Sequence, residues 1–187
     1  MSGLIRCFVA VDVDEPAIVS RVVDIQRSLS ESGALMKLVE PENLHVTLRF
    51  IGEVPALTVE RIKEELGKLS FRGFTVTFRG LGAFPSAQNP RVVWIGVSQG
   101  AEELSRLSGE VNALLRRVRL PSPKEEFVPH LTIARVKSRA RALSSLITKL
   151  SEVEVGSMRV SSVRLKKSTL TSRGPIYETL LEVPARG

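Results

Sequence analysis

Two short stretches decide how this chain folds: Leu-His-Val-Thr-Leu at residues 44–48 and Pro-His-Leu-Thr-Ile at residues 129–133. They contain both histidines of the 187-residue sequence, and in each a threonine follows two residues after the histidine. Alternation of polar and apolar residues predicts a β-strand with one buried face. Because side chains at i and i+2 point to the same face of a strand, each stretch presents an imidazole beside a hydroxyl.

Helices and strands alternate on either side of these stretches, and the order repeats. Apolar periodicity predicts strands at residues 4–11, 35–39, 44–51, 71–84 (one long or two short), 91–97, 127–135, 153–165 and 176–183, and helices at 14–33, 59–69, 104–118 and 143–150. In both halves the histidine strand stands directly before the second helix. This repetition predicts an internal duplication, and two α+β lobes that face each other are its natural product. We expect one bilobal domain over residues 1–187.

The duplicated pair of side chains indicates a particular chemistry. If the halves are related by an approximate two-fold axis, two imidazoles and two hydroxyls surround one small cavity. A phosphoryl group fits such a cavity, because the hydroxyls can donate to its charged oxygens. One imidazole can take a proton from the nucleophile while the other gives one to the leaving oxygen. A lone histidine on a strand is more often a packing residue, but the equivalent placement of two pairs favours catalysis.

Metal and thiol chemistry find less support in the sequence. Zinc catalysis usually needs three protein ligands, and the chain has two histidines, one cysteine and no H-E-x-x-H or C-x-x-C motif. The single cysteine, Cys7, lies in an apolar strand without a pattern that favours a thiolate, so we expect it in the core. The sequence therefore predicts neither a metal nor a cofactor.

The net charge of +7 is unevenly distributed. Residues 1–93 carry 11 Lys and Arg against 11 Asp and Glu, whereas residues 94–187 carry 16 against 9. This asymmetry favours a polyanionic partner such as nucleic acid, although a solvated basic face would look the same. No apolar run approaches the ~20 residues that span a bilayer, and residues 1–10 contain no signal-peptide pattern. We expect no membrane association and a cytoplasmic location.

The two histidine stretches resemble the motifs of the two-histidine (2H) phosphoesterase superfamily, in particular the RNA 2′,3′-cyclic phosphodiesterases also called 2′-5′ RNA ligases. The resemblance continues along the whole chain. It is carried by RCFVA at 6–10, HVTLRFIG at 45–52, PRVVW at 90–94, FVPHLTIAR at 127–135, and the tail from Ser168 through Leu170 and Gly174-Pro175 to Tyr177.

The resemblance implies a bilobal α+β fold, with an antiparallel sheet in each lobe, helices packed outside and the active-site cleft between the lobes. It also implies catalysis without a metal. His45 and His130 become the acid–base pair, with His130 favoured as the base and His45 as the acid. Thr47 and Thr132 become the donors to the phosphate.

Two arginines and three aromatic residues complete the expected site. By resemblance, Arg135 contacts phosphate or RNA, although in a regular strand it would point away from His130, and only a bulge or bend brings it round. By strand parity, Arg49 shares the face of the first histidine and is a further phosphate ligand. Three aromatic residues could stack on a base, but we expect each to be core: Phe8, Phe50 and Tyr177.

The function that these features favour is opening of a 2′,3′-cyclic phosphate at an RNA end by water, which leaves a 2′-phosphate. The expected partners are RNA ends, such as those of tRNA fragments, and the expected state is a monomer. Three alternatives stay open at this point. They are 2′-5′ joining of RNA ends as the main role, a phosphodiesterase for small cyclic nucleotides, and a non-catalytic RNA-binding module that uses the basic half.

Overall fold

The computed structural model describes residues 3–187, so the first two residues of the N-terminal stretch 1–10 lie outside it. The strands are β1 (Leu4–Asp12), β2 (Leu35–Leu38), β3 (His45–Pro55), β4 (Phe74–Pro85), β5 (Pro90–Gln99), β6 (His130–Ser138), β7 (Glu154–Val160), β8 (Ser162–Thr171) and β9 (Gly174–Pro184). The helices are α1 (Pro16–Ser30), α2 (Ala56–Leu66), α3 (Ala101–Arg117) and α4 (Arg141–Lys149), with a short 3₁₀ helix, η1 (Pro41–Asn43).

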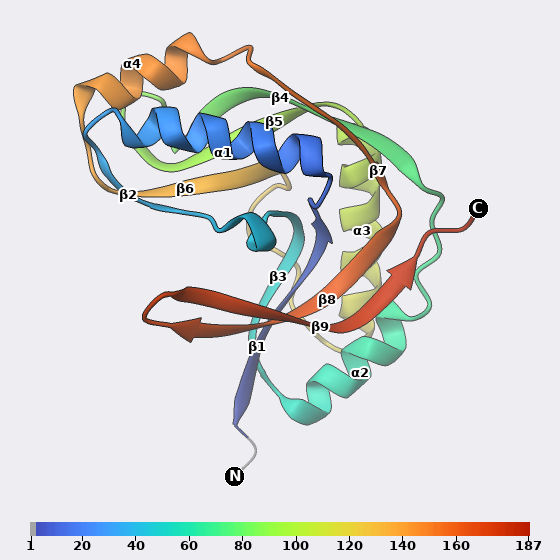
Figure 1. Ribbon diagram of the computed structural model, residues 1–187. Coiled ribbons are helices and arrows are strands. Elements are labelled where there is room, and N and C mark those ends of the chain that lie inside the picture. Colours follow the sequence, from blue (N-terminus) through green and yellow to red (C-terminus); the bar gives the residue numbers. More distant parts are fainter. Residues whose placement is uncertain (1–2) are drawn as a thin grey trace.

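The strands form two antiparallel sheets. The four-stranded sheet has the order β3-β1-β8-β9, and the five-stranded sheet has the order β2-β6-β5-β4-β7. Figure 1 shows α1 and α4 lying together on the five-stranded sheet, while α2 and α3 lie beside the four-stranded sheet. The prediction of an α+β fold with two lobes, each an antiparallel sheet covered by helices, is confirmed.

The two sheets are built alike. The order β3-β1-β8-β9 matches β6-β5-β4-β7 strand for strand, with β2 added at one edge. In both sheets the histidine strand pairs with the first strand of its half, β1 or β5. The lobes do not coincide with the halves of the sequence, however. Helix α1 follows a strand of the four-stranded sheet yet packs on the five-stranded one, and α3 crosses in the opposite direction.

Helix α1 illustrates how local sequence sets these elements. Pro16 is its first residue, a position where a fixed φ and a missing N–H cost nothing. Its inward face is made of the apolar residues whose spacing predicted the helix, and all of them are buried: Ile18, Val22, Ile25 and Leu29. Beyond the helix, Gly33 has a φ of 83° and turns the chain back toward β2.

Some predicted strand boundaries are wrong, and two of them are informative. Residues 153–165 form two strands rather than one, because the chain leaves the five-stranded sheet after Val160 and enters the four-stranded sheet at Ser162. Val160 and Val163 are both buried in the shared apolar core, so the hydrophobic pattern runs through the crossing unbroken. The strand expected from residue 127 begins only at the second histidine.

Apolar side chains from both sheets join in one continuous core. The assignment of residues 1–187 to a single domain stays a prediction. No helix in the described range 3–187 is long and apolar enough to cross a membrane.

Candidate active site

A cavity of about 510 Å³ lies where the two sheets meet, and strands β3 and β6 contact each other there. Both histidines and both threonines of the repeated stretches line it. The remaining walls come from β1, from the end of β2 and the turn after it, from the later residues of β3 and β6, and from the β8–β9 hairpin. They are lined by Arg6, Phe8, Lys37, Leu38, Val39, Glu40, Asn43, Phe50, Arg135, Ser168, Leu170, Gly174, Pro175 and Tyr177.

The first imidazole is held from both sides. Nδ1 of His45 lies 2.7 Å from the carbonyl oxygen of Asn43, and its Nε2 lies 3.0 Å from Oγ1 of Thr47. Because a carbonyl can only accept, Nδ1 carries a proton, and in the neutral ring Nε2 is the free base. The side chain of Asn43 is buried and donates to the carbonyl of Pro175 at 3.0 Å, which ties η1 to the β8–β9 hairpin.

The second imidazole repeats this arrangement. Nδ1 of His130 lies 2.6 Å from the carbonyl oxygen of Val128, again two residues before the histidine. The ring packs edge-on against Phe84, with 5.1 Å between the ring centroids, and lies 6.3 Å from the ring of Trp94. Both histidines therefore have the same ring nitrogen fixed by the backbone and leave Nε2 for chemistry.

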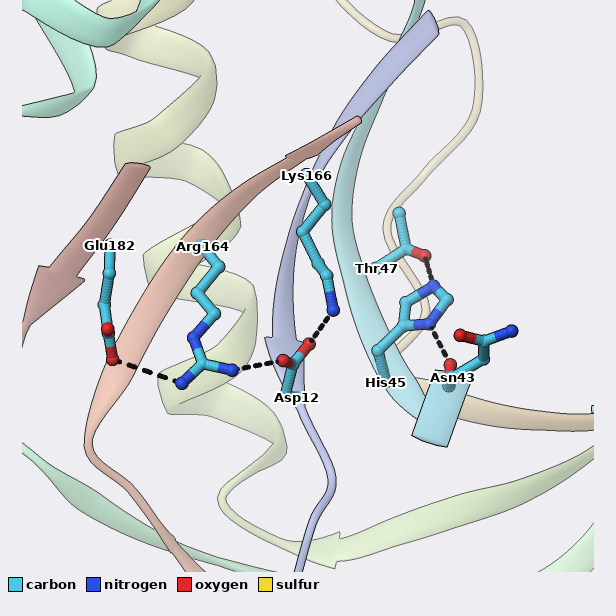
Figure 2. A network of polar contacts seen from close by, with 7 residues as sticks. All are labelled: Asp12, Asn43, His45, Thr47, Arg164, Lys166 and Glu182. Atoms are coloured by element: carbon cyan, nitrogen blue, oxygen red, sulfur yellow. Dashed lines mark hydrogen bonds and ion pairs between the residues drawn. The ribbon is translucent and has the colours of Figure 1, made fainter. Parts of the chain in front are cut away.

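Charged residues behind the first histidine form a chain across three strands, which Figure 2 shows. Nζ of Lys166 lies 2.8 Å from Oδ1 of Asp12, Nη1 of Arg164 lies 2.5 Å from Oδ2 of the same carboxylate, and Glu182 extends the chain. Burial lowers the pKa of His45, and the charge of Lys166 lowers it further, while Asp12 raises it. The free protein therefore holds the first imidazole mostly neutral near pH 7.

A bulge in β6 brings Arg135 to the cavity. Thr132 pairs with Trp94 and Ala134 pairs with Val93, so Ile133 is an extra residue on β6. An extra residue shifts every later side chain to the opposite face. Arg135 accordingly lines the cavity with the second histidine pair, and its charge acts on the first histidine across the cleft. This is the bend that the sequence analysis required.

Strand β3 carries two bulges against β1, at Leu48 and at Ile51, and the first of them has the opposite consequence for Arg49. Thr47 pairs with Ala10 and Arg49 with Val9, so Leu48 is the extra residue. The prediction that Arg49 shares the face of the first histidine is therefore wrong, because the bulge breaks the parity on which it rested. Phe50 occupies the position on β3 that Arg135 occupies on β6, and it lines the cavity.

Arg49 instead makes structural contacts away from the cavity. Its guanidinium donates to Oδ1 of Asn112 on α3 at 3.1 Å and to the carbonyl of Pro121. The residue thereby fastens β3 to the loop that leads to the second histidine strand.

The aromatic residues differ in exposure. Phe8 is buried against His45, with 4.9 Å between ring centroids, as expected of a core residue. The expectation for Phe50 is wrong, since 51% of its surface is exposed and the guanidinium of Arg6 lies 4.8 Å from its ring centroid. Tyr177 is half-buried, packs edge-on against His45, and has its pKa raised by burial.

Several site residues carried no signal in the sequence. Arg6 and Lys37 lie in strands whose partners decide which way they point, and Asn43 lies in a turn. Asp12 and Lys166 are separated by 154 residues and meet only because β1 pairs with β8.

Two further observations concern metal binding and the cysteine. In the described part of the chain, no group of three or more His, Cys, Asp or Glu side chains is arranged to hold a metal ion. Burial raises the pKa of Cys7 to about 11, so its thiol stays protonated at neutral pH.

Comparison with known proteins gives consistent matches along the chain. The model of the 2′-5′ RNA ligase superfamily matches residues 15–169. A protein of Aeropyrum pernix named RNA 2′,3′-cyclic phosphodiesterase is 48% identical over 170 residues, which covers 90% of this chain and 97% of that protein. A protein of Archaeoglobus fulgidus with the same name is 44% identical and covers 94% of this chain and 97% of its own length.

A solved structure shares the architecture. The crystal structure of TT0787 of Thermus thermophilus superimposes with a TM-score of 0.80 at 29% identity, over 97% of this chain and 98% of that one. The repeated histidine strands, the two matching sheets and these relatives agree: the chain belongs to the 2′-5′ RNA ligase superfamily of 2H phosphoesterases.

Proposed function

We propose that this protein hydrolyses 2′,3′-cyclic phosphates at RNA ends to 2′-phosphates. The observation that carries the proposal is the pair of equivalent His-x-Thr strands that line one cavity, each with the Nδ1 of its histidine bonded to a backbone carbonyl, so that Nε2 is the nitrogen available for proton transfer. Relatives that share up to 48% of their residues with this chain are named for this activity on RNA. Acid–base groups in a matched pair have no purpose in a module that only binds RNA.

In the proposed reaction, Nε2 of His130 takes a proton from water as its oxygen attacks the phosphorus. The bond from phosphorus to the ribose 3′-oxygen breaks, and Nε2 of His45 gives that oxygen a proton. The product keeps its phosphate on the 2′-oxygen, and the two histidines have exchanged protonation states. Thr47 donates to the first imidazole at rest and is released to the phosphate once that ring is protonated. Thr132 and Arg135 donate to the same phosphate oxygens.

The cavity's other residues support a nucleotide rather than a bare phosphate. Arg6, Lys37 and Arg135 give it a cationic wall against one carboxylate, Glu40. Phe50 adds an exposed apolar surface for the nucleoside. The physiological RNA, including tRNA fragments, the monomeric state and the cytoplasmic location stay predictions.

The test is turnover of a short RNA that ends in a 2′,3′-cyclic phosphate, with saturating EDTA present. We expect full activity and a product whose phosphate is on the 2′-oxygen. A 3′-phosphate product would contradict the assigned leaving group. Loss of activity in EDTA that a divalent ion restores would contradict the metal-free mechanism.

The two bulges predict that the arginines Arg135 and Arg49 behave differently. Arg135→Met should lower kcat/KM by about 10–150-fold, because a hydrogen bond to a charged group is worth roughly 1.5–3 kcal/mol. Arg49→Met should leave KM unchanged and lower stability by about 1 kcal/mol for each hydrogen bond lost. Steady-state kinetics and thermal unfolding of the two variants measure this, and equal losses of kcat/KM would contradict it.

The lowered pKa of His45 predicts the pH dependence. An acid acts only while protonated, so kcat/KM should rise as the pH falls from about 8 toward about 6. Lys166 and Arg135 lower this pKa while Asp12 raises it. Lys166→Met should therefore raise the pKa of His45 and move the high-pH limb of kcat/KM to higher pH. A profile with no fall at high pH would contradict the need for a protonated histidine.

A further inference from the structure

The bulges at Ile133 and Leu48 are each held from behind by a buried polar side chain. On α1, the amide nitrogen of Gln26 donates both its hydrogens, to the carbonyl of Ile133 at 2.9 Å and to that of Val39 at 2.9 Å. Ile133 is the extra residue of the β6 bulge. Gln26 is 5% exposed on a helix face whose other inward residues are apolar.

The second bulge has the same support from the equivalent helix. On α3, the hydroxyl of Ser108 donates to the carbonyl of Leu48 at 2.8 Å. Leu48 is the extra residue of the first β3 bulge, the one that precedes Phe50, and Ser108 is 2% exposed. Helices α1 and α3 follow the corresponding strands β1 and β5 and cross to opposite sheets, so the two contacts are related by the internal repeat.

Buried polar groups are costly, and the described residues contain few of them. A buried amide or hydroxyl costs roughly 1–3 kcal/mol when it is left without a partner. Residues 3–187 bury four polar or charged side chains, and every one touches a histidine strand or its surroundings: Gln26, Asn43, Ser108 and Lys166. Asn43 and Lys166 belong to the first histidine. The other two take no part in the mechanism above.

We propose that Gln26 and Ser108 are positioning residues that hold the two bulges and thereby aim Arg135 and Phe50 into the cavity. A bulge is one residue away from regular pairing, and a slip of one residue turns every later side chain to the other face. Without the Gln26 amide, the Val39 carbonyl loses a partner and the extra residue loses one of its two bonds.

The bulges at Ile133 and Leu48 place different side chains at equivalent positions of the two histidine strands. The β6 bulge delivers a cation to the phosphate, and the β3 bulge delivers an apolar ring and removes Arg49 from the cavity. Gln26 therefore controls the affinity for the phosphate through Arg135, and Ser108 controls the apolar surface that contacts the nucleoside through Phe50. This division rests on the proposed function for its substrate but not for its geometry.

The test is a pair of double-mutant cycles. Inorganic phosphate is the probe for the first. Gln26→Met should weaken its binding about as much as Arg135→Met, by about 10–150-fold, and the double variant should lose little more than either single variant. Adenosine 2′-monophosphate is the probe for the second, in which Ser108→Ala and Phe50→Ala should likewise be non-additive, with Ser108→Thr restoring affinity. The cross pairs, Gln26 with Phe50 and Ser108 with Arg135, should be additive.

A spectroscopic readout separates positioning from a general loss of stability. Trp94 is the single tryptophan, and it pairs with Thr132 beside the β6 bulge. Gln26→Met should shift its emission in the folded protein. Gln99→Met, which removes an exposed glutamine bonded to Thr77 at 3.0 Å, is the matched control and should not.

Additive effects of Gln26→Met with Arg135→Met, or of Ser108→Ala with Phe50→Ala, would overturn the proposal. So would a lower stability of Gln26→Met with unchanged emission and phosphate affinity. Should Gln26→Met fail to fold, the cycle of Ser108→Ala with Phe50→Ala tests the proposal, because Ser108→Ala removes only one hydroxyl. None of these readouts needs turnover. An enzyme inactive on cyclic RNA but coupled in this way would refute the proposed function and leave the positioning role standing.

Discussion

Replacing either histidine with alanine is expected to lower kcat on RNA with a 2′,3′-cyclic phosphate by about 10²–10⁴-fold, the usual contribution of one positioned acid or base. Thr47→Val and Thr132→Val should cost less, about 10–150-fold, because each removes one hydrogen bond to a charged group. Steady-state kinetics with each purified variant give the comparison. Thermal unfolding serves as the control that the variants are folded.

The order of these effects is the informative part. If His45 and His130 transfer protons, their loss must exceed the loss of the hydroxyls beside them. The double alanine variant should be hardly worse than the worse single variant, because one missing partner already stops the proton relay. Full activity in either single variant would end the two-histidine account.

The largest effect on stability is expected from Asp12→Ala. The carboxylate bonds the ammonium of Lys166 at 2.8 Å and the guanidinium of Arg164 at 2.5 Å (Figure 2). Lys166 is only 5% exposed, so removing its partner leaves a charge in a site with little water. Breaking a buried ion pair on one side costs about 3–5 kcal/mol. Chemical denaturation measures this loss directly.

A matched double variant tests the physical reason. In a Lys166→Met background no buried ammonium is left without a partner, so Asp12→Leu should cost much less than it does in the natural protein. Arg164 keeps Glu182 in either case. Equal costs in both backgrounds would mean that Asp12 stabilises the fold by packing and not by its charge.

Strand periodicity predicted the two histidine strands and the repeat, because alternation is a local property of the chain. The faces of His45, Thr47, His130 and Thr132 follow from i and i+2 spacing alone. The exchange of helices between the lobes is not local. A buried strand reads the same whichever sheet it joins, as the break between β7 and β8 shows.

Arg49 and Arg135 show where parity stops working. Counting residues from the histidine places Arg49 in the cavity and Arg135 outside it, and two bulges reverse both results. A bulge is defined by the pairing of one strand against its neighbour. The side chains that bond the extra residues, Gln26 and Ser108, lie on helices elsewhere in the chain. An isolated glutamine or serine on the apolar face of a helix was the available clue.

The most direct test of two-histidine acid–base catalysis compares two leaving groups. A phosphodiester that releases 4-nitrophenolate needs no acid to protonate the departing oxygen, whereas opening a cyclic phosphate does. We expect His45→Ala to recover most of its activity on the nitrophenyl ester while His130→Ala stays inactive on both substrates. Recovery of His130→Ala alone would exchange the two roles, and equal losses for both variants on both substrates would contradict the proposed division between acid and base.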